Sequence, residues 1–415
     1  MAVSLTEMRL ADPDSYVDRV PYEWFDRLRR DAPVSWHDEP EPNHGFWAVV
    51  RHRDVDMVMN DPATFSSARG ITFEEMEPDA LEARRSMMET DPPRHTRLRK
   101  LVSPLFTPRA MREYEPFARE IARDVVERAL ELGEFDFVEE VARQLPIRVL
   151  ARVLGVPDED TPQLVAWGDR MIGNMDPEFT DTVVGRDDTS AHRLLPFRSP
   201  AAAELTDYGH AMGALRRDDP QNDLVSKLVH AEVDGQHLTK PEFDNFFSLL
   251  VVAGNETTRH TITHGMLALM QHPDQMARLA SDPSLMPVAV EEILRYATVT
   301  MQFRRTATRD LELHGQAIHT GDKVVVWFIA ADFDEDVFDD PYRFDITRTP
   351  NPHQAFGSGG PHFCLGAPLA RMEIRLMFEE LLPRLASIEQ TGPTSRLRSN
   401  FINGIKHMPV RVLSR

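Results

Sequence analysis

The sequence of 415 residues contains one cysteine, Cys364, which excludes an intrachain disulfide and any metal site built from several cysteines. Long hydrophobic runs are also absent: the longest, residues 246–254, is far shorter than the roughly 20 residues that span a bilayer. The N-terminal residues have no basic segment followed by an apolar stretch, unlike a secretory signal. We therefore expect a cytoplasmic protein without a membrane anchor.

Positive charge is scarce as well. The 47 Lys and Arg residues face 67 Asp and Glu residues, which gives a formal net charge of −20. Such an acidic chain repels a phosphate backbone, so nucleic acid is not the expected partner, although a local basic patch remains possible. No repeat, linker or change in composition divides the chain, and we expect a single domain over residues 1–415.

Most of the chain has the periodicity of core-facing helices. The clearest stretches are residues 114–132, 138–154 and 284–297. Short apolar segments typical of strands occur at residues 34–36, 46–50 and 311–328. Residues 176–200 are polar and irregular, which indicates a long loop and a candidate mobile lid. The predicted fold class is mainly α with a small β region.

One predicted helix is long and apolar almost all round. A capping box at residues 239–242 starts it and the pattern continues to about Gln271, a length of roughly 48 Å. Its middle carries Gly254, Glu256 and Thr257, where a buried helix prefers Ala and Leu. Residues that oppose the local structure inside a core are expected at functional sites.

Cys364 ends a glycine-rich loop, residues 356–366, that leads into a helix over residues 367–382. At a helix N-terminus the dipole and the free N–H groups favour the thiolate, which is the form that binds metal. A lone cysteine is more often a small buried hydrophobe, but the glycines here also let the backbone approach a flat cofactor. The loop lacks the pattern of a dinucleotide site, a P-loop or a hydrolase nucleophile elbow.

Two other pairs are weak signals by themselves. His260 and His264 have a zinc-binding spacing, but the glutamate of a metalloprotease helix is missing, and core or solvated histidines are the better interpretation. Glu292 and Arg295 lie three residues apart on one helix, which as a surface pair contributes only a few tenths of a kcal/mol.

Basic residues give a further candidate site. The helix start at residues 91–100 places His95 and Arg99 on one face, and Arg305 stands alone after residues 298–303. These side chains form either a solvated charged face or a clamp for an anion.

Taken together, the motifs resemble the cytochrome P-450 haem-thiolate monooxygenases from about Pro21 to the C-terminus. Four separate motifs stand in that family's order: residues 253–257, the pair Glu292 and Arg295, residues 339–344, and the cysteine loop. The resemblance implies the cytochrome P-450 fold, with a long central helix over haem and Cys364 ligating the haem iron. It makes Glu292 and Arg295 a buried structural pair.

The resemblance also implies the site residues. Thr257 and Glu256 would serve catalysis by activating oxygen and relaying protons. The residues implied to contact haem are Cys364, His95, Arg99, Arg305, His362, Gly359, Phe356 and Gly254. Those implied to line the substrate pocket, under the loop of residues 70–88, are Leu249, Val252, Ala253, Val299, Thr300, Met301 and Ile402.

Departures from the commonest family pattern indicate a branch. The cysteine loop is one residue longer, Asp332-Phe333 stands where many members have Asn-Arg, and Asn351-Pro352-His353 precedes the loop. These features are similar to the bacterial branch that oxidises sterol side chains, terpenoids and methyl-branched lipids.

The implied activity is insertion of one oxygen atom from O2 into a C–H bond of a hydrophobic substrate by a monomeric, haem b-containing oxidoreductase. NAD(P)H would supply electrons indirectly, through a ferredoxin reductase and a ferredoxin. Candidate docking residues are Arg94, Arg97, Lys100, Arg109, Arg112, Arg371 and Arg375. The alternatives are a non-enzymatic haem protein, either a gas sensor or an electron carrier, and a peroxygenase that uses peroxide directly.

Overall fold

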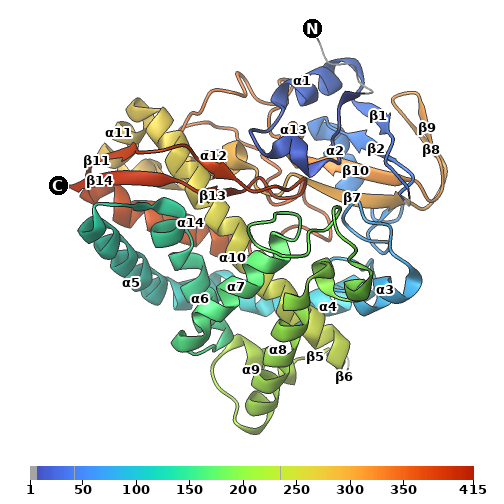
Figure 1. Ribbon diagram of the computed structural model, residues 1–415, viewed down its shortest axis with the longest axis horizontal. Coiled ribbons are helices and arrows are strands. Elements are labelled where there is room, and N and C mark those ends of the chain that lie inside the picture. Colours follow the sequence, from blue (N-terminus) through green and yellow to red (C-terminus); the bar gives the residue numbers. More distant parts are fainter. Residues whose placement is uncertain (1–6, 42, 234) are drawn as a thin grey trace.

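The computed structural model describes residues 7–41, 43–233 and 235–415 and is mainly helical (Figure 1). The helices are α1 Tyr22–Asp31, α2 His52–Asn60, α3 Pro78–Ala83, α4 Arg94–Val102, α5 Pro108–Leu132, α6 Gln144–Leu154, α7 Thr161–Ile172, α8 Pro200–Asp218, α9 Leu224–His230, α10 Lys240–Gln271, α11 Pro273–Ser281, α12 Met286–Ala297, α13 Phe328–Ala331 and α14 Ala367–Leu381. The strands are β1 Val34–His37, β2 Phe46–Val49, β3 Phe65–Ser66, β4 Glu134–Asp136, β5 Glu232–Val233, β6 Gln236–His237, β7 Gln302–Ala307, β8 Leu311–Leu313, β9 Gln316–Ile318, β10 Lys323–Trp327, β11 Leu385–Gln390, β12 Ser395–Arg396, β13 Ile405–His407 and β14 Pro409–Ser414. The expected fold class is confirmed.

The largest sheet has the strand order β1-β2-β10-β7-β3. Strand β10 runs parallel to β2 and antiparallel to β7, so that Val325 pairs with Ala48 on one side and Arg304 on the other. Every residue of β10 is buried. Val325 and Trp327 pack in a cluster with Phe25, and Val324 and Val326 pack in another cluster with valines of α2. Residues 311–328, which the sequence predicts as a sheet region, contain β8, β9 and β10. Strand β7 is not predicted from the sequence.

Helix α10 crosses the whole molecule and is contacted by α6, α7, α8, α12 and α14 (Figure 1). Its predicted capping box is confirmed: the Glu242 N–H donates to Thr239 Oγ1 at 3.4 Å, and the Thr239 N–H donates to Glu242 Oε2 at 3.0 Å. Since other helices surround it, the polar residues in its middle are held inside the protein.

The segment between α7 and α8, residues 173–199, is irregular apart from two short 3-10 turns, as the sequence predicted. Residues 138–154 are not one regular helix: a π-helical turn, Val138–Ala142, precedes α6. Within the described residues no helix combines the length and the apolar character needed to cross a membrane.

Candidate active site

The cysteine loop is closed by a hydrogen bond from the Cys364 N–H to the Phe356 carbonyl at 3.0 Å. Gly357, Gly359 and Gly360 have positive φ angles of 81°, 99° and 68°. At Gly360 a side chain would also come within 2.5 Å of a backbone carbonyl of α2, so only glycine is accommodated there. Gly359 likewise packs against the end of α2, at Asn60, so its role is to shape the loop.

The sulfur of Cys364 lies at the start of α14. Burial raises the pKa of the thiol, while the N–H groups of Gly366 and Ala367 and the positive charge of Arg99 act in the opposite direction. A metal cation bound at the sulfur would also lower the pKa of the thiol and would hold the sulfur as the thiolate.

Four nitrogen-bearing side chains from three segments gather beside the cysteine loop: His95 and Arg99 of α4, Arg305 of β7, and His362. The His95 and His362 rings are 4.2 Å apart. Burial, together with the positive charge of Arg99 and Arg305, lowers the pKa of His95 to about 4 and that of His362 to about 2. The histidines are therefore neutral at pH 7 and the arginines carry the charge.

These groups are short of anionic partners. Arg305 is fully buried, and burial lowers its pKa to about 10 although Asp91 partly offsets this. Arg305 donates to the Arg304 carbonyl and Arg99 to the Phe363 carbonyl. His95 Nε2 is buried and has no hydrogen-bond partner in the part of the chain that the structure describes. Within the described residues, neither arginine forms an ion pair. The donor set fits a cofactor that brings carboxylates of its own, as haem does.

Helix α10 opens toward an internal space at its centre. Ala253 is exposed and Thr257 partly exposed, although both lie midway along a buried helix. The Thr257 hydroxyl donates to the Ala253 carbonyl at 2.9 Å. Gly254 faces elsewhere, because a side chain there would meet Leu150 of α6 at 3.3 Å, and it serves the close packing of the two helices.

Glu256 points away from that opening, toward α7. It has no exposed surface and lies in an ion-pair cluster with Arg259 of α10 and Asp169 of α7. Neither Arg259 nor Asp169 was singled out from the sequence, because each looks like an ordinary surface charge of a helix. Asn255 donates to Glu256 Oε1 at 2.9 Å and completes the contacts of the carboxylate.

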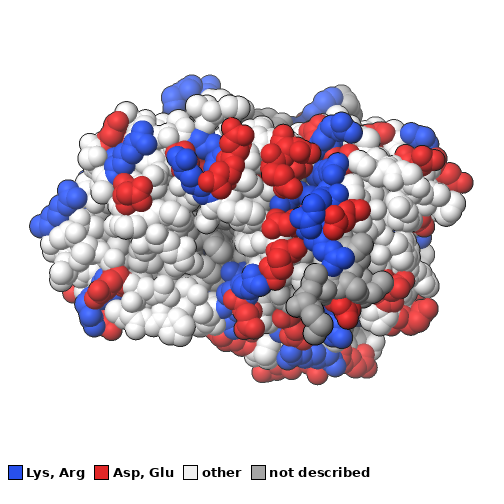
Figure 2. Space-filling view, turned by 90° about the horizontal axis from the view of Figure 1, so that it is seen from above, with Lys and Arg blue, Asp and Glu red and all other residues white. Residues whose placement is uncertain are grey.

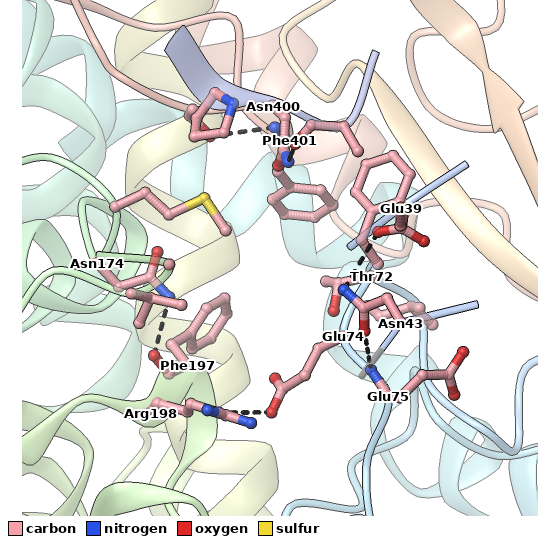
Figure 3. A pocket seen from close by; sticks show the side chains of 18 of the residues that line it. Glu39, Asn43, Thr72, Glu74, Glu75, Asn174, Phe197, Arg198, Asn400 and Phe401 are labelled. Atoms are coloured by element: carbon pink, nitrogen blue, oxygen red, sulfur yellow. Dashed lines mark hydrogen bonds and ion pairs between the residues drawn. The ribbon is translucent and has the colours of Figure 1, made fainter. Parts of the chain in front are cut away.

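A cavity of about 1020 Å³ lies between the 173–199 segment, the first sheet and α10. Figure 3 shows Asn174, Phe197 and Arg198 on one side, Glu39, Asn43, Thr72, Glu74 and Glu75 on the other, and Asn400 and Phe401 at a third. Ile71, Phe73, Leu249 and Phe401 give it an apolar wall, whereas the ion pair from Arg198 Nε to Glu74 Oε1, 2.6 Å, lies at its charged rim.

Only some of the predicted pocket residues line this cavity. Leu249 lines this cavity, as does much of the 70–88 loop. Val252, Val299, Met301 and Ile402 are buried and do not line it; Met301 packs with Phe73 and Trp327 in a core cluster, and Ile402 forms a bridge with Thr300. Phe401, adjacent to Ile402, is partly exposed and lines the cavity instead, because alternate residues of an extended segment face opposite sides.

The two histidines with zinc-like spacing are structural. Burial lowers the pKa of His264 to about 4 and of His260 still further. His264 Nε2 bonds to the Asn403 carbonyl at 2.8 Å and His260 Nδ1 accepts from the Ile405 N–H at 3.3 Å. They fasten the chain after Phe401 to α10, and the part of the chain that the structure describes contains no cluster of three metal-binding side chains.

The candidate docking arginines are mostly neutralised by glutamates. The pairs are Arg94 and Arg97 with Glu242, Arg109 with Glu113, Arg371 with Glu291, and Arg375 with Glu115 and Glu379. Lys100 and Arg112 have no ion pair within the described residues. The five paired arginines therefore do not form the continuous positive patch that the sequence suggested. On the face seen from above the view of Figure 1, charges of both signs are likewise mixed (Figure 2).

Comparison with known proteins agrees with this geometry. The family model for cytochrome P-450 matches residues 213–406. The chain is 40% identical over 409 residues to the steroid C26-monooxygenase of Rhodococcus jostii (strain RHA1), covering 96% of this chain and 83% of that protein. It is also 40% identical over 395 residues to the methyl-branched lipid omega-hydroxylase of Mycobacterium tuberculosis (strain ATCC 25618 / H37Rv), covering 93% and 90%.

Solved structures are similar too. A Mycobacterium marinum cytochrome P-450 in complex with pseudoionone superposes with a TM-score of 0.86 and 41% identity, covering 94% of each chain. A Bacillus megaterium cytochrome P-450 in complex with testosterone gives a TM-score of 0.79 and 32% identity, covering 94% of this chain and 99% of that one.

The fold and these relatives define an oxidoreductase of the monooxygenase class. The chain belongs to the cytochrome P-450 family, whose members contain haem and use electrons that derive from NAD(P)H.

Proposed function

We propose that this enzyme binds haem b through the Cys364 thiolate and hydroxylates an unactivated C–H bond of a steroid, terpenoid or methyl-branched lipid. The observation that carries the cofactor assignment is the buried cationic set beside the cysteine loop. Among the described residues, neither Arg99 nor Arg305 forms an ion pair, and His95 Nε2 has no hydrogen-bond partner. The names of the relatives support the substrate class.

Haem ligated by a thiolate supplies the activation of dioxygen, since the electron-rich sulfur favours cleavage of the O–O bond. The chain holds the cofactor at two places. Cys364 would bind the iron from the start of α14, and Arg99, Arg305 and His95 would donate hydrogen bonds to the carboxylates of the haem. Haem propionates at this position would form hydrogen bonds with polar groups that are buried away from water.

The residues of α10 supply protons and exclude water. The Thr257 hydroxyl faces the internal opening and is able to donate to bound oxygen or a water once it leaves the Ala253 carbonyl. Glu256 precedes it on the helix and holds a proton near neutral pH, because burial raises the pKa of its carboxyl to about 7 against the opposing charge of Arg259.

The substrate would occupy the cavity of about 1020 Å³, with its hydrocarbon against Leu249, Phe73 and Phe401. Similar proteins have been crystallised with pseudoionone and with testosterone, which are ketones on a large apolar frame. Electrons would come from a ferredoxin and its reductase, and the enzyme would act as a monomer.

The cofactor assignment is tested by spectroscopy. The ferrous carbonyl complex of the native protein should have the red-shifted Soret band of thiolate ligation, and Cys364→Ala should lose it. Arg305→Leu should retain the band while losing haem faster to apomyoglobin. A carbonyl spectrum of histidine type in freshly prepared native protein would overturn the assignment.

The substrate class is tested by a ligand panel. Steroid ketones, linear terpenes and branched fatty acids should shift the haem spin state and be hydroxylated, whereas small polar aromatics should do neither. A response to the polar compounds alone would reject the proposed class.

A further inference from the structure

Arg259 is shared between two carboxylates that come from different helices. Its Nη1 donates to Asp169 Oδ1 of α7 at 2.7 Å, and its Nη2 donates to Glu256 of α10. Both Arg259 and Glu256 are buried. The guanidinium therefore divides its strongest hydrogen bonds between a residue next to Thr257 and one that lies 90 positions earlier in the chain.

The cluster continues outward from Asp169. Asp169 Oδ2 accepts from Arg143 Nη2 at 2.9 Å, and Arg143 Nη1 donates to Glu139 Oε2 at 2.6 Å. Glu139, on the π-helical turn before α6, is 37% exposed and thus reaches water. Charges of opposite sign alternate from the interior of α10 to the surface.

The charges of this cluster do not balance when all groups are ionised. Glu256, Asp169 and Glu139 carry three negative charges, whereas Arg259 and Arg143 carry two positive ones. One added proton gives neutrality, and it is best placed on the most deeply buried carboxyl, which is that of Glu256.

The surroundings of Glu256 agree with this placement. Burial raises the pKa of Glu256 to about 7, with Asp169 raising it and Arg259 and Arg143 lowering it. On its own helix it also faces His260, whose Nε2 is 3.8 Å away and which burial keeps neutral. Opposite it on α7 lies Gly168, where a Cβ atom would be 3.6 Å from Glu256 Oε1, so α7 packs closely against the carboxyl at this point.

We propose that Asp169 is a positioning residue for proton delivery: by holding one arm of Arg259, it leaves Glu256 free to bind and release a proton beside Thr257. The inference rests on the proposed roles of Glu256 and Thr257. Asp169 itself does not line the cavity. Without it, Arg259 would pair with Glu256 alone and hold that carboxylate in its ionised form.

The protonation of Glu256 can be followed directly by infrared difference spectroscopy, using the carboxyl C=O stretch across a pH titration. Glu256→Gln assigns the band. In Asp169→Asn the apparent pKa should fall by about one unit, which is a tenfold change in the ratio of protonated to ionised carboxyl at a given pH. In Arg143→Gln it should rise, because a positive charge is removed and Arg259 is drawn toward Asp169.

A matched control removes one negative charge elsewhere. Asp124 forms an exposed ion pair with Arg148 at 2.6 Å on the surface, and Asp124→Asn should leave the Glu256 band unchanged. Asp169→Glu, which keeps the charge, should restore most of the wild-type titration.

Turnover provides a second readout. In Asp169→Asn the rate of product formation should fall several-fold at pH 8 and recover toward pH 6, with substrate affinity unchanged. The inference would be overturned if both Asp169→Asn and Arg143→Gln kept the thiolate spectrum and turnover while the pKa of Glu256 stayed at its wild-type value. Opposite pKa shifts in a protein that lacks the thiolate spectrum would instead reject the proposed function and leave the coupling of these residues intact.

Discussion

Glu292 and Arg295 are joined inside the protein by two hydrogen bonds, Nε to Oε2 and Nη2 to Oε1, both 2.8 Å long. Neither residue has exposed surface. Arg348, Asn351 and the Asp345 N–H also donate to Glu292, and Arg295 donates to carbonyls on the same connecting segment. The pair thus fastens the chain that leads to the cysteine loop onto α12.

We expect Glu292→Gln to lower the free energy of unfolding by about 3–5 kcal/mol, because the Arg295 charge would remain buried without its partner. Denaturant unfolding of the haem-loaded protein measures this. Glu134→Gln, at the exposed pair with Arg411, is the control and should change stability little. Wild-type stability for Glu292→Gln would contradict the structural role.

Parts of this structure are encoded locally and were predictable. The capping box of α10 and the glycines before Cys364 act through their own backbone, so a short window of sequence contains the whole signal. The partners of Arg259 and Arg97 were not predictable, because each is joined to a carboxylate distant in sequence and nothing in the local pattern marks which acid will be near. The same reason applies to Arg371, whose partner Glu291 is 80 residues away, whereas the pairs of Arg109 with Glu113 and of Arg375 with Glu379 are local.

Thr257 should govern the coupling of electron use to product. In Thr257→Ala the hydroxyl that faces the opening is lost, and we expect NAD(P)H consumption to continue while product falls and peroxide rises. Thr261→Ala is a matched control, since Thr261 makes the same bond to the carbonyl one turn back, at 2.9 Å, but is buried. Equal uncoupling in the two variants would show that the effect comes from helix packing.

Glu373 of α14 should make stability depend on pH. Its carboxyl is buried, and neither oxygen has a hydrogen-bond partner within the described residues. Burial raises the pKa of this carboxyl well above the ordinary value, and the nearby Thr258 hydroxyl offsets only part of that rise. Glu373 ionises at lower pH in the unfolded chain than in the folded protein. The free energy of unfolding should therefore decrease as pH rises above the pKa of Glu373 in the unfolded chain, by about 1.4 kcal/mol per pH unit until its pKa in the folded protein is reached.

Glu373→Gln removes this ionisation while preserving the shape of the side chain. Its melting temperature relative to wild type should therefore increase between pH 5 and pH 8. Glu120→Gln, on the exposed side of α5, should show no such trend. A difference between Glu373→Gln and wild type that is constant with pH would mean that Glu373 is not the responsible group.

Ion pairs should control access to the cavity. Within residues 173–199, Arg186 pairs with Asp14 at 3.2 Å, Arg193 binds Asp79 through two bonds of 2.7 and 2.6 Å, and Arg198 binds Glu74. These side chains are partly or largely exposed, so salt weakens them. An uncharged steroid should therefore enter and leave faster at high salt, measured by stopped-flow spin-state change.

A charge exchange isolates one of these pairs. Arg193→Asp should speed binding of the same steroid at low salt, and the double variant Arg193→Asp with Asp79→Arg should restore the slow rate. Rates that are independent of salt, or a double variant as fast as the single one, would show that the ion pairs do not limit entry.

Reduction by an acidic ferredoxin should depend on few of the arginines near the cysteine loop. A protein of charge −20 repels such a partner at long range, and most of the candidate cations are paired with glutamates. Arg112 of α5 and Lys100 of α4 are exposed and have no ion pair within the described residues. These two should therefore carry most of the local attraction.

We expect Arg112→Glu to slow ferredoxin-dependent reduction several-fold at low salt and Arg109→Glu to slow it less, because Glu113 already offsets Arg109 at 3.2 Å. Both effects should shrink as the Debye length falls to about 8 Å near physiological ionic strength. Arg217→Glu, which makes the same charge change at an exposed position of α8, is the control, and substrate binding should be unchanged in all three. A reduction rate that rises with salt in the wild type would show that global repulsion outweighs these cations, and that this face does not dock the ferredoxin.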